Sequence, residues 1–302
     1  MLTRKNLQGV WTALITPFKQ NGALDLPAFD KLLARQITAG VTGVLINGTT
    51  GESPTLTTEE VKLLVKRAKQ KTKGKCLLMV GSGTNCTAKS ISASKNAVRD
   101  GADVLLVVNP YYNKPTQEGL YLHFKSIADS VKTPIILYNI KGRTSVNLET
   151  TTLLRLIKNS KNIIGVKEAS GDLKQIAEVC QKRPANFTVL SGDDGITFQV
   201  MRDNQADGVI SVASNIAPKQ VVNLVTQALN KNWSTAEKIN NTLAELMKKI
   251  FIETNPIPVK YAIYKMGLCQ NSYRLPMCPI TKKSSLVINQ ELKKLTKTNN
   301  LS

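Results

Sequence analysis

IIGVKEASGD, residues 163–172, is the stretch of this chain that decides its fold. Ile163, Ile164 and Val166 form a β-branched run typical of a strand buried on both faces, and the run ends at Lys167 and Glu168. Burial disfavours a charged ammonium, so we expect the pKa of Lys167 to fall below the free value of about 10.4. A neutral lysine can attack a carbonyl and form a Schiff base. The alternative is a lysine that reaches the surface or pairs with Glu168.

Runs of this kind recur along the first three quarters of the chain. They lie at residues 10–15, 43–46, 76–80, 104–108, 135–138, 163–166, 187–190 and 209–212. The segments between them have helical spacing and helix start signals, such as Asp25 with Pro27, and Thr57 with Glu60 three residues later. This alternation predicts an α/β fold, a (β/α)8 TIM barrel. A doubly wound open sheet is the competing architecture, but the Gly-x-Gly-x-x-Gly turn expected after its first strand is missing from the sequence.

The strand pattern stops after Lys231. Residues 234–252, 259–268 and 284–295 have helical patterns, and Pro256 and Pro258 separate the first two of these segments. We therefore expect a catalytic barrel domain over residues 1–231. Residues 232–302 are expected to form a C-terminal helical region that extends the barrel rather than an independent globular domain.

Composition limits the function classes. The 302 residues are 42% hydrophobic, enough for a sizeable core, and the sequence contains neither a run of about 18 apolar residues nor a signal-peptide pattern, so no membrane partner is expected. The net charge of +20 is spread along the chain without interleaved aromatic residues, which favours a solvated basic surface over nucleic-acid binding. Five scattered cysteines without Cys-x-x-Cys spacing favour a reduced, cytoplasmic location.

Polar residues follow the predicted strands, where the active site of a barrel of this type lies. The turn at residues 47–53 offers backbone N–H groups and hydroxyls to an anion such as a carboxylate. Other strands end at Thr16, Gly81-Ser82-Gly83, residues 109–113, Tyr138-Asn139, Lys167, residues 191–194 and Ser211. The only histidine, His123, lies in a helical stretch, so a Ser-His-Asp triad and a histidine-built metal site are excluded and no metal is expected. Carbonyl chemistry through an imine fits the residues that remain.

Six motifs together resemble the dihydrodipicolinate synthase family. They are GTTGE at 48–52, YYN at 111–113 with QEG at 117–119, YN at 138–139, GVKEA at 165–169, SGDD at 191–194 and NPIPVK at 255–260. The resemblance covers nearly the whole chain. It implies a lyase that condenses pyruvate with L-aspartate 4-semialdehyde, giving 4-hydroxy-tetrahydrodipicolinate for diaminopimelate and lysine biosynthesis, with no cofactor beyond a covalent pyruvate imine. Other Schiff-base pyruvate aldolases, such as N-acetylneuraminate lyases and 2-keto-3-deoxy-gluconate aldolases, share the barrel and the lysine and are the alternative.

The resemblance also implies catalytic roles. Lys167 would form the Schiff base with pyruvate, and Tyr138 would be the general acid and base. Thr50 would link Tyr138 to Tyr112 in a hydroxyl relay, with Tyr112 inserted from a neighbouring subunit. Family members are commonly homotetramers built from two tight dimers, so a homotetramer is expected here.

Substrate-binding residues follow from the same resemblance. The turn containing Thr49 and Thr50 would hold the pyruvate carboxylate, and Arg143 would engage the carboxylate of the semialdehyde. Gly192 and Ile210 would line the site through backbone groups. Lys141 stands where the family usually has proline, so a less rigid loop is expected before Arg143.

Regulation is a second departure from the family pattern. In lysine-inhibited relatives the effector site uses histidines and a glutamate that pairs with the amino group of the effector. The corresponding positions here are Thr58, Val61 and Lys89, although Asn85 and Tyr111 remain. Because a cation at position 89 opposes a cationic ligand, we predict weak or absent feedback inhibition by lysine.

Overall fold

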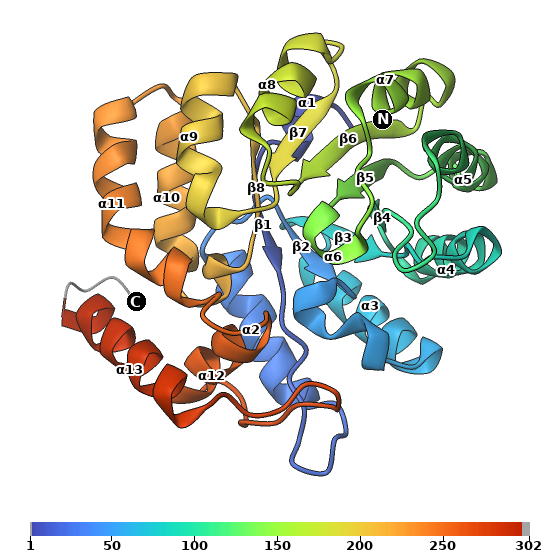
Figure 1. The fold of residues 1–302 in the computed structure, drawn as a ribbon. Coiled ribbons are helices and arrows are strands. Elements are labelled where there is room, and N and C mark those ends of the chain that lie inside the picture. The colour runs from blue at the N-terminus through green and yellow to red at the C-terminus, as the bar shows by residue number, and fades with distance from the viewer. Residues whose placement is uncertain (1, 298–302) are drawn as a thin grey trace.

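Eight parallel strands form a closed barrel in which each strand pairs with its neighbours in sequence order (Figure 1). The computed structural model describes residues 2–297. The strands are β1 Gly9–Ala13, β2 Gly43–Ile46, β3 Leu77–Gly81, β4 Val104–Val108, β5 Ile135–Asn139, β6 Ile163–Glu168, β7 Thr188–Ser191 and β8 Gly208–Ser211. β1 also pairs with β8, which closes the ring and rules out the open doubly wound sheet. The (β/α)8 prediction is confirmed.

Helices surround the barrel and connect its strands (Figure 1). The connecting helices are α2 Leu26–Thr38, α3 Thr58–Thr72, α4 Thr87–Asp100, α5 Gln117–Ser130, α6 Lys141–Thr144, α7 Thr150–Asn159, α8 Leu173–Lys182 and α9 Asp194–Asn204. Short α1 Arg4–Leu7 precedes β1, and α10 Pro218–Leu229 follows β8. Three short 3₁₀ helices, η1 Thr49–Gly51, η2 Ser53–Thr55 and η3 Ala213–Asn215, follow strands β2 and β8. Both predicted start signals are confirmed: Asp25 caps α2 through the Ala28 N–H, and Thr57 and Glu60 form a capping box on α3.

The apolar core has two layers, one between strands and helices and one inside the barrel. Short α1 closes the N-terminal end of the barrel with buried Leu7, whose carbonyl accepts a 2.8 Å hydrogen bond from the indole of Trp11. Apolar side chains such as Met79 and Leu190 fill the interior above it. The interior of the barrel is therefore packed shut at its N-terminal end.

The pairing of β5 with β6 contains a one-residue irregularity. Ile135 pairs with Ile163, but Ile136 pairs with Gly165, so Ile164 is an extra residue in β6. The shift makes Tyr138 the direct partner of Lys167. Tyr138 belongs to the inner layer of the core, so its neighbour Lys167 points inward as well.

The C-terminal segments predicted as helical are α11 Trp233–Lys249, α12 Ile257–Lys265 and α13 Lys282–Lys297. α11 packs against α9 and α10, and α13 packs against α11 and α12, so they form a helical extension on one side of the barrel (Figure 1). Pro258 lies in the first turn of α12 rather than in the break before it. The division at residue 231 stays a prediction, and residues 298–302 lie outside the described part of the chain. No helix within residues 2–297 has the length and apolar character needed to cross a bilayer.

Candidate active site

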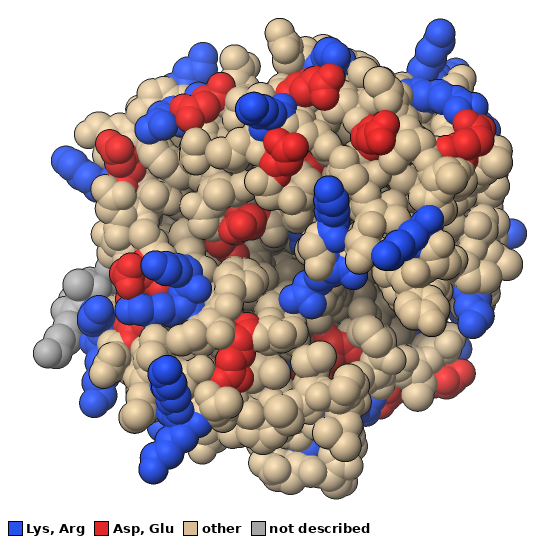
Figure 2. Space-filling model, viewed as in Figure 1, with Lys and Arg blue, Asp and Glu red and all other residues tan. Residues whose placement is uncertain are grey.

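A cavity of about 430 Å³ opens at the C-terminal mouth of the barrel. Figure 2 shows the hollow near the centre of this face, with basic side chains at its rim. Every strand, or the loop directly after it, contributes to the lining through Ala13, Leu45, Gly81, Val108, Tyr138, Lys167, Gly192 and Val212. The C-terminal region adds Phe251 and Asn255. Small-molecule sites of TIM barrels lie at this mouth, which makes the cavity the candidate active site.

Lys167 lies in the cavity lining and is 6% exposed. Burial lowers the pKa of its amine to about 8; nearby Asp194 opposes the shift and the cation of Arg143 adds to it. The amine is therefore much closer to its neutral, nucleophilic state at neutral pH than a free lysine is.

Glu168 does not neutralise this amine. Its carboxylate accepts hydrogen bonds from the Asn139 amide at 3.1 Å, the Ser170 N–H at 2.8 Å and the Gln175 amide at 3.3 Å. Burial raises the pKa of Glu168, and these donors lower it. Since Glu168 follows Lys167 directly on β6, its side chain points to the opposite face of the strand. Both alternatives for Lys167, surface exposure and pairing with Glu168, are excluded.

Burial raises the pKa of the Tyr138 phenol, and the nearby Thr49 side chain lowers it. Thr50, which the sequence reasoning expected beside Tyr138, instead accepts a 3.0 Å hydrogen bond from the Asn255 amide. The two threonines open the 3₁₀ helix η1, where successive side chains point about 120° apart. Only one of the two hydroxyls can therefore face Tyr138, and it is that of Thr49.

Arg143 lies at the rim of the cavity, on the short helix α6. Its guanidinium donates to the Asn255 carbonyl at 3.4 Å. The segment expected to be a loop is thus one helical turn, in which the N–H groups of Arg143 and Thr144 both donate to the Ile140 carbonyl.

Of the other predicted site residues, Gly192 lines the cavity, whereas Ile210 and Tyr112 do not. Gly192 lines the cavity, and a Cβ at this position would lie 3.0 Å from Lys167 Cε and 2.5 Å from Ala169 Cβ. Ile210 lies within the packed barrel interior and is absent from the cavity lining. Tyr112 is 89% exposed with a φ of 74° and also lies outside the lining, while Tyr111 is part of it.

Two buried groups of the site received no role from the sequence. Asp194 accepts hydrogen bonds from the Ser211 hydroxyl at 2.5 Å and the Val212 N–H at 2.8 Å, and burial raises the pKa of its carboxyl. Asn255 approaches from the C-terminal region. Asp194 belongs to the SGDD motif and Asn255 to the NPIPVK motif, but no local sequence pattern predicts the hydrogen bonds that they make. Within residues 2–297 no group of three His, Cys, Asp or Glu side chains is arranged as metal ligands.

Comparison with known proteins identifies the family to which this chain is similar. The model of the dihydrodipicolinate synthetase family matches residues 6–295. Curated relatives named 4-hydroxy-tetrahydrodipicolinate synthase include that of Endomicrobium trichonymphae, 48% identical over 94% of this chain and 97% of the relative. The enzyme of that name from Pelodictyon phaeoclathratiforme is 44% identical over 97% of this chain and 99% of the relative. The crystal structure of dihydrodipicolinate synthase from Aquifex aeolicus superimposes with a TM-score of 0.93 at 41% identity, covering 98% of this chain and 99% of that one.

Proposed function

The chain belongs to the dihydrodipicolinate synthetase family, and from this premise we propose that it condenses pyruvate with L-aspartate 4-semialdehyde through a Schiff base on Lys167. The product is 4-hydroxy-tetrahydrodipicolinate, an intermediate of lysine biosynthesis. The observation that carries the proposal is the buried Lys167 amine, with its pKa lowered to about 8, in a cavity at the C-terminal mouth of the barrel.

The first half of the reaction activates pyruvate. The neutral Lys167 amine attacks C2 of pyruvate, and the carbinolamine loses water to give the imine. Removal of a proton from C3 then gives the enamine. Tyr138 is suited to carry these protons because it lies beside Lys167 and its hydroxyl is near the Thr49 side chain. We assign the relay hydroxyl next to Tyr138 to Thr49, in place of Thr50.

The second half forms the carbon–carbon bond. C3 of the enamine attacks the aldehyde carbon, and the new alkoxide takes a proton, for which Tyr138, the strand partner of Lys167, is the proposed donor. The amino group of the semialdehyde then attacks C2 and displaces Lys167, which closes the ring and frees the amine. The positive charge of Arg143 at the rim is suited to the carboxylate of the semialdehyde.

The carboxylate of pyruvate fits the turn after β2. Thr49 and Thr50 both line the cavity and start η1, so hydroxyls and backbone N–H groups are available to an anion. Gly192 leaves room for the Lys167 side chain on the other side. No cofactor enters this scheme because the imine itself is the electron sink.

We also propose a homotetramer in which Tyr112 acts in the site of a neighbouring subunit. The support is its exposure of 89% and its left-handed backbone, which hold the phenol away from its own cavity. Analytical ultracentrifugation tests the assembly. Mixing inactive Lys167→Ala and Tyr112→Ala proteins tests the exchange of tyrosines, since shared sites would regain activity.

Borohydride trapping tests the reaction class. Incubation with pyruvate followed by borohydride should add one pyruvate-derived mass to the peptide that contains Lys167. A coupled assay should then give turnover with aspartate semialdehyde. Turnover with N-acetylneuraminate or 2-keto-3-deoxy-gluconate in its place would assign the chain to another pyruvate aldolase, and an unlabelled Lys167 would refute the Schiff base.

A further inference from the structure

Asn255 connects the C-terminal region with both groups proposed to bind substrate carboxylates. It lies between α11 and α12, is 6% exposed and lines the cavity. Its side-chain amide donates to Thr50 Oγ1 at 3.0 Å, and its backbone carbonyl accepts from the Arg143 guanidinium at 3.4 Å. One residue from outside the barrel strands therefore touches the site at two points.

The direction of the hydrogen bond to Thr50 matters. A threonine hydroxyl has one proton and can accept through its lone pairs. Because the Asn255 amide donates to Oγ1, the Thr50 proton must point elsewhere, and Thr50 lines the cavity. A carboxylate only accepts hydrogen bonds, so it needs this hydroxyl as a donor.

We propose that Asn255 is a positioning residue that keeps the Thr50 hydroxyl a hydrogen-bond donor toward the carboxylate of pyruvate. This inference rests on the proposed function, since pyruvate supplies the carboxylate. The hydrogen bond to Thr50 is the only one made by the Asn255 side chain to the described residues, and its Oδ1 is buried without a partner there. Replacing the Asn255 amide with a carboxylate therefore alters mainly the hydrogen bond to Thr50.

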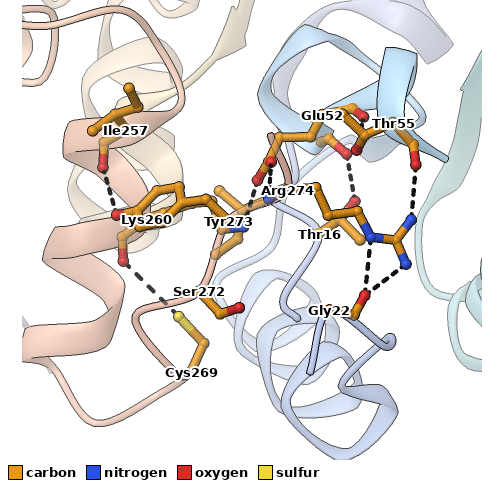
Figure 3. A network of polar contacts seen from close by, with 12 residues as sticks. Thr16, Gly22, Glu52, Thr55, Ile257, Lys260, Cys269, Ser272, Tyr273 and Arg274 are labelled. Atoms are coloured by element: carbon orange, nitrogen blue, oxygen red, sulfur yellow. Dashed lines mark hydrogen bonds and ion pairs between the residues drawn. The ribbon is translucent and has the colours of Figure 1, made fainter. Parts of the chain in front are cut away.

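A buried ion pair holds the C-terminal region against the same turn. Lys260 of α12 pairs with Glu52, which comes two residues after Thr50, and both side chains are 1% exposed (Figure 3). The Glu52 carboxylate also accepts from the Arg274 N–H at 3.2 Å. The Arg274 guanidinium donates to the carbonyls of Thr55 at 2.8 Å and Gly22 at 2.7 Å. These contacts fix α12, and Asn255 just before it, relative to Thr50.

The Asn255→Asp variant tests the proposal because it keeps the shape of the side chain and reverses the hydrogen bond. The new carboxylate would accept the Thr50 proton and withdraw it from the substrate. We expect the pyruvate KM, and the pyruvate concentration that gives half-maximal borohydride trapping, to rise about tenfold to a hundredfold. At saturating pyruvate, kcat should fall by less than about threefold, because the groups that react are unchanged.

A double-mutant cycle with Thr50→Val separates positioning from simple repulsion or misfolding. If Asn255 acts through the Thr50 hydroxyl, the double variant should have a pyruvate KM less than about threefold above that of the Thr50→Val single variant. Asn271→Asp is the matched control. Asn271 lies in the C-terminal region outside the cavity lining, and its Oδ1 is also buried without a partner among the described residues. The pyruvate KM of the Asn271→Asp enzyme should equal that of the wild type. Asn255→Ala, which only removes the donor, should raise KM by about threefold to tenfold if the aspartate variant does not fold.

Equal effects of Asn255→Asp with and without the Thr50 hydroxyl would overturn the inference. So would a loss of kcat with an unchanged pyruvate KM. Failure of the wild type to form any pyruvate adduct would instead refute the proposed function, so the two failures can be told apart.

Discussion

Tyr138 and Lys167 are direct partners on the neighbouring strands β5 and β6, and Lys167 Nζ lies 4.2 Å from the centroid of the Tyr138 ring. The strand register therefore holds an acid/base group beside the amine without help from a flexible loop. Such pre-organisation is what a reaction with several proton transfers at one carbon–nitrogen centre requires.

Replacement of the tyrosine hydroxyl should slow catalysis. Tyr138→Phe removes the hydroxyl proposed to move protons and leaves the amine in place, so kcat/KM should fall by about 10²- to 10⁴-fold while slow borohydride trapping at Lys167 persists. Thr49→Val should resemble Tyr138→Phe more closely than Thr50→Val does, because the Thr49 side chain lowers the pKa of Tyr138, whereas the Thr50 hydroxyl accepts from Asn255. Steady-state kinetics of the three variants checks the order, and a larger loss of kcat in Thr50→Val would contradict it.

The pH dependence of imine formation should follow Lys167. Burial lowers the pKa of its amine from 10.5 to about 8, and only the neutral amine attacks pyruvate. The rate of adduct formation at low pyruvate should rise about tenfold per pH unit below pH 8 and level off above it. Stopped-flow trapping from pH 6 to 9.5 measures this profile. A rate that still rises tenfold per unit at pH 9.5 would mean that the amine has the pKa of an exposed lysine.

The same buried amine should cost stability. The pKa of Lys167 is lower in the folded state, so the unfolded chain binds the proton more tightly. The resulting loss of folding free energy is complete below about pH 8 and disappears as the pH rises toward 10.5. A drop from 10.5 to about 8 corresponds to about 3 kcal/mol at most. Lys167→Met should therefore raise the free energy of unfolding at pH 7 by about 1–3 kcal/mol, with a smaller gain at pH 10. Urea unfolding at both pH values checks this, and a loss of stability at pH 7 would contradict it.

Gly192→Ala should disturb the lysine without reaching the substrate directly. The added methyl would lie 2.5 Å from Ala169 Cβ and 3.0 Å from Lys167 Cε, so the amine must move. We expect the rate of pyruvate trapping to fall about tenfold to a hundredfold. Gly142→Ala is the control, because a Cβ there meets nothing within 4 Å. Equal rates for both variants would show that the lysine tolerates the methyl.

Feedback inhibition by lysine should be weak or absent. Exposed Lys89 on α4 puts a cation where lysine-inhibited relatives are expected to have a glutamate, and Thr58 and Val61 occupy positions where histidines are expected in those relatives. Initial rates with up to about 10 mM lysine should stay within about twofold of the uninhibited rate, since like charges repel. Calorimetry that detects micromolar lysine binding would contradict the prediction. Lys89→Glu alone should increase whatever lysine affinity exists.

The sequence by itself determined the barrel and most of its site. Strands in the structure start and end within two residues of the predicted runs because each run is an apolar segment, with β-branched residues in it, that packs on both faces. Helix starts at Asp25 and Thr57 follow from local capping chemistry. Lys167, Tyr138 and Gly192 lie at strand ends, and the closed barrel brings strand ends together.

Only the tertiary structure decided which side chains meet. Counted by simple alternation, Lys167 would lie on the face of Ile163, which packs outside the barrel. The extra residue at Ile164 reverses that count, because a one-residue shift moves every later side chain to the other face. The pairing of Tyr138 with Thr49 and the approach of Asn255 to Thr50 depend in the same way on backbone turns and long-range packing, which local sequence does not encode.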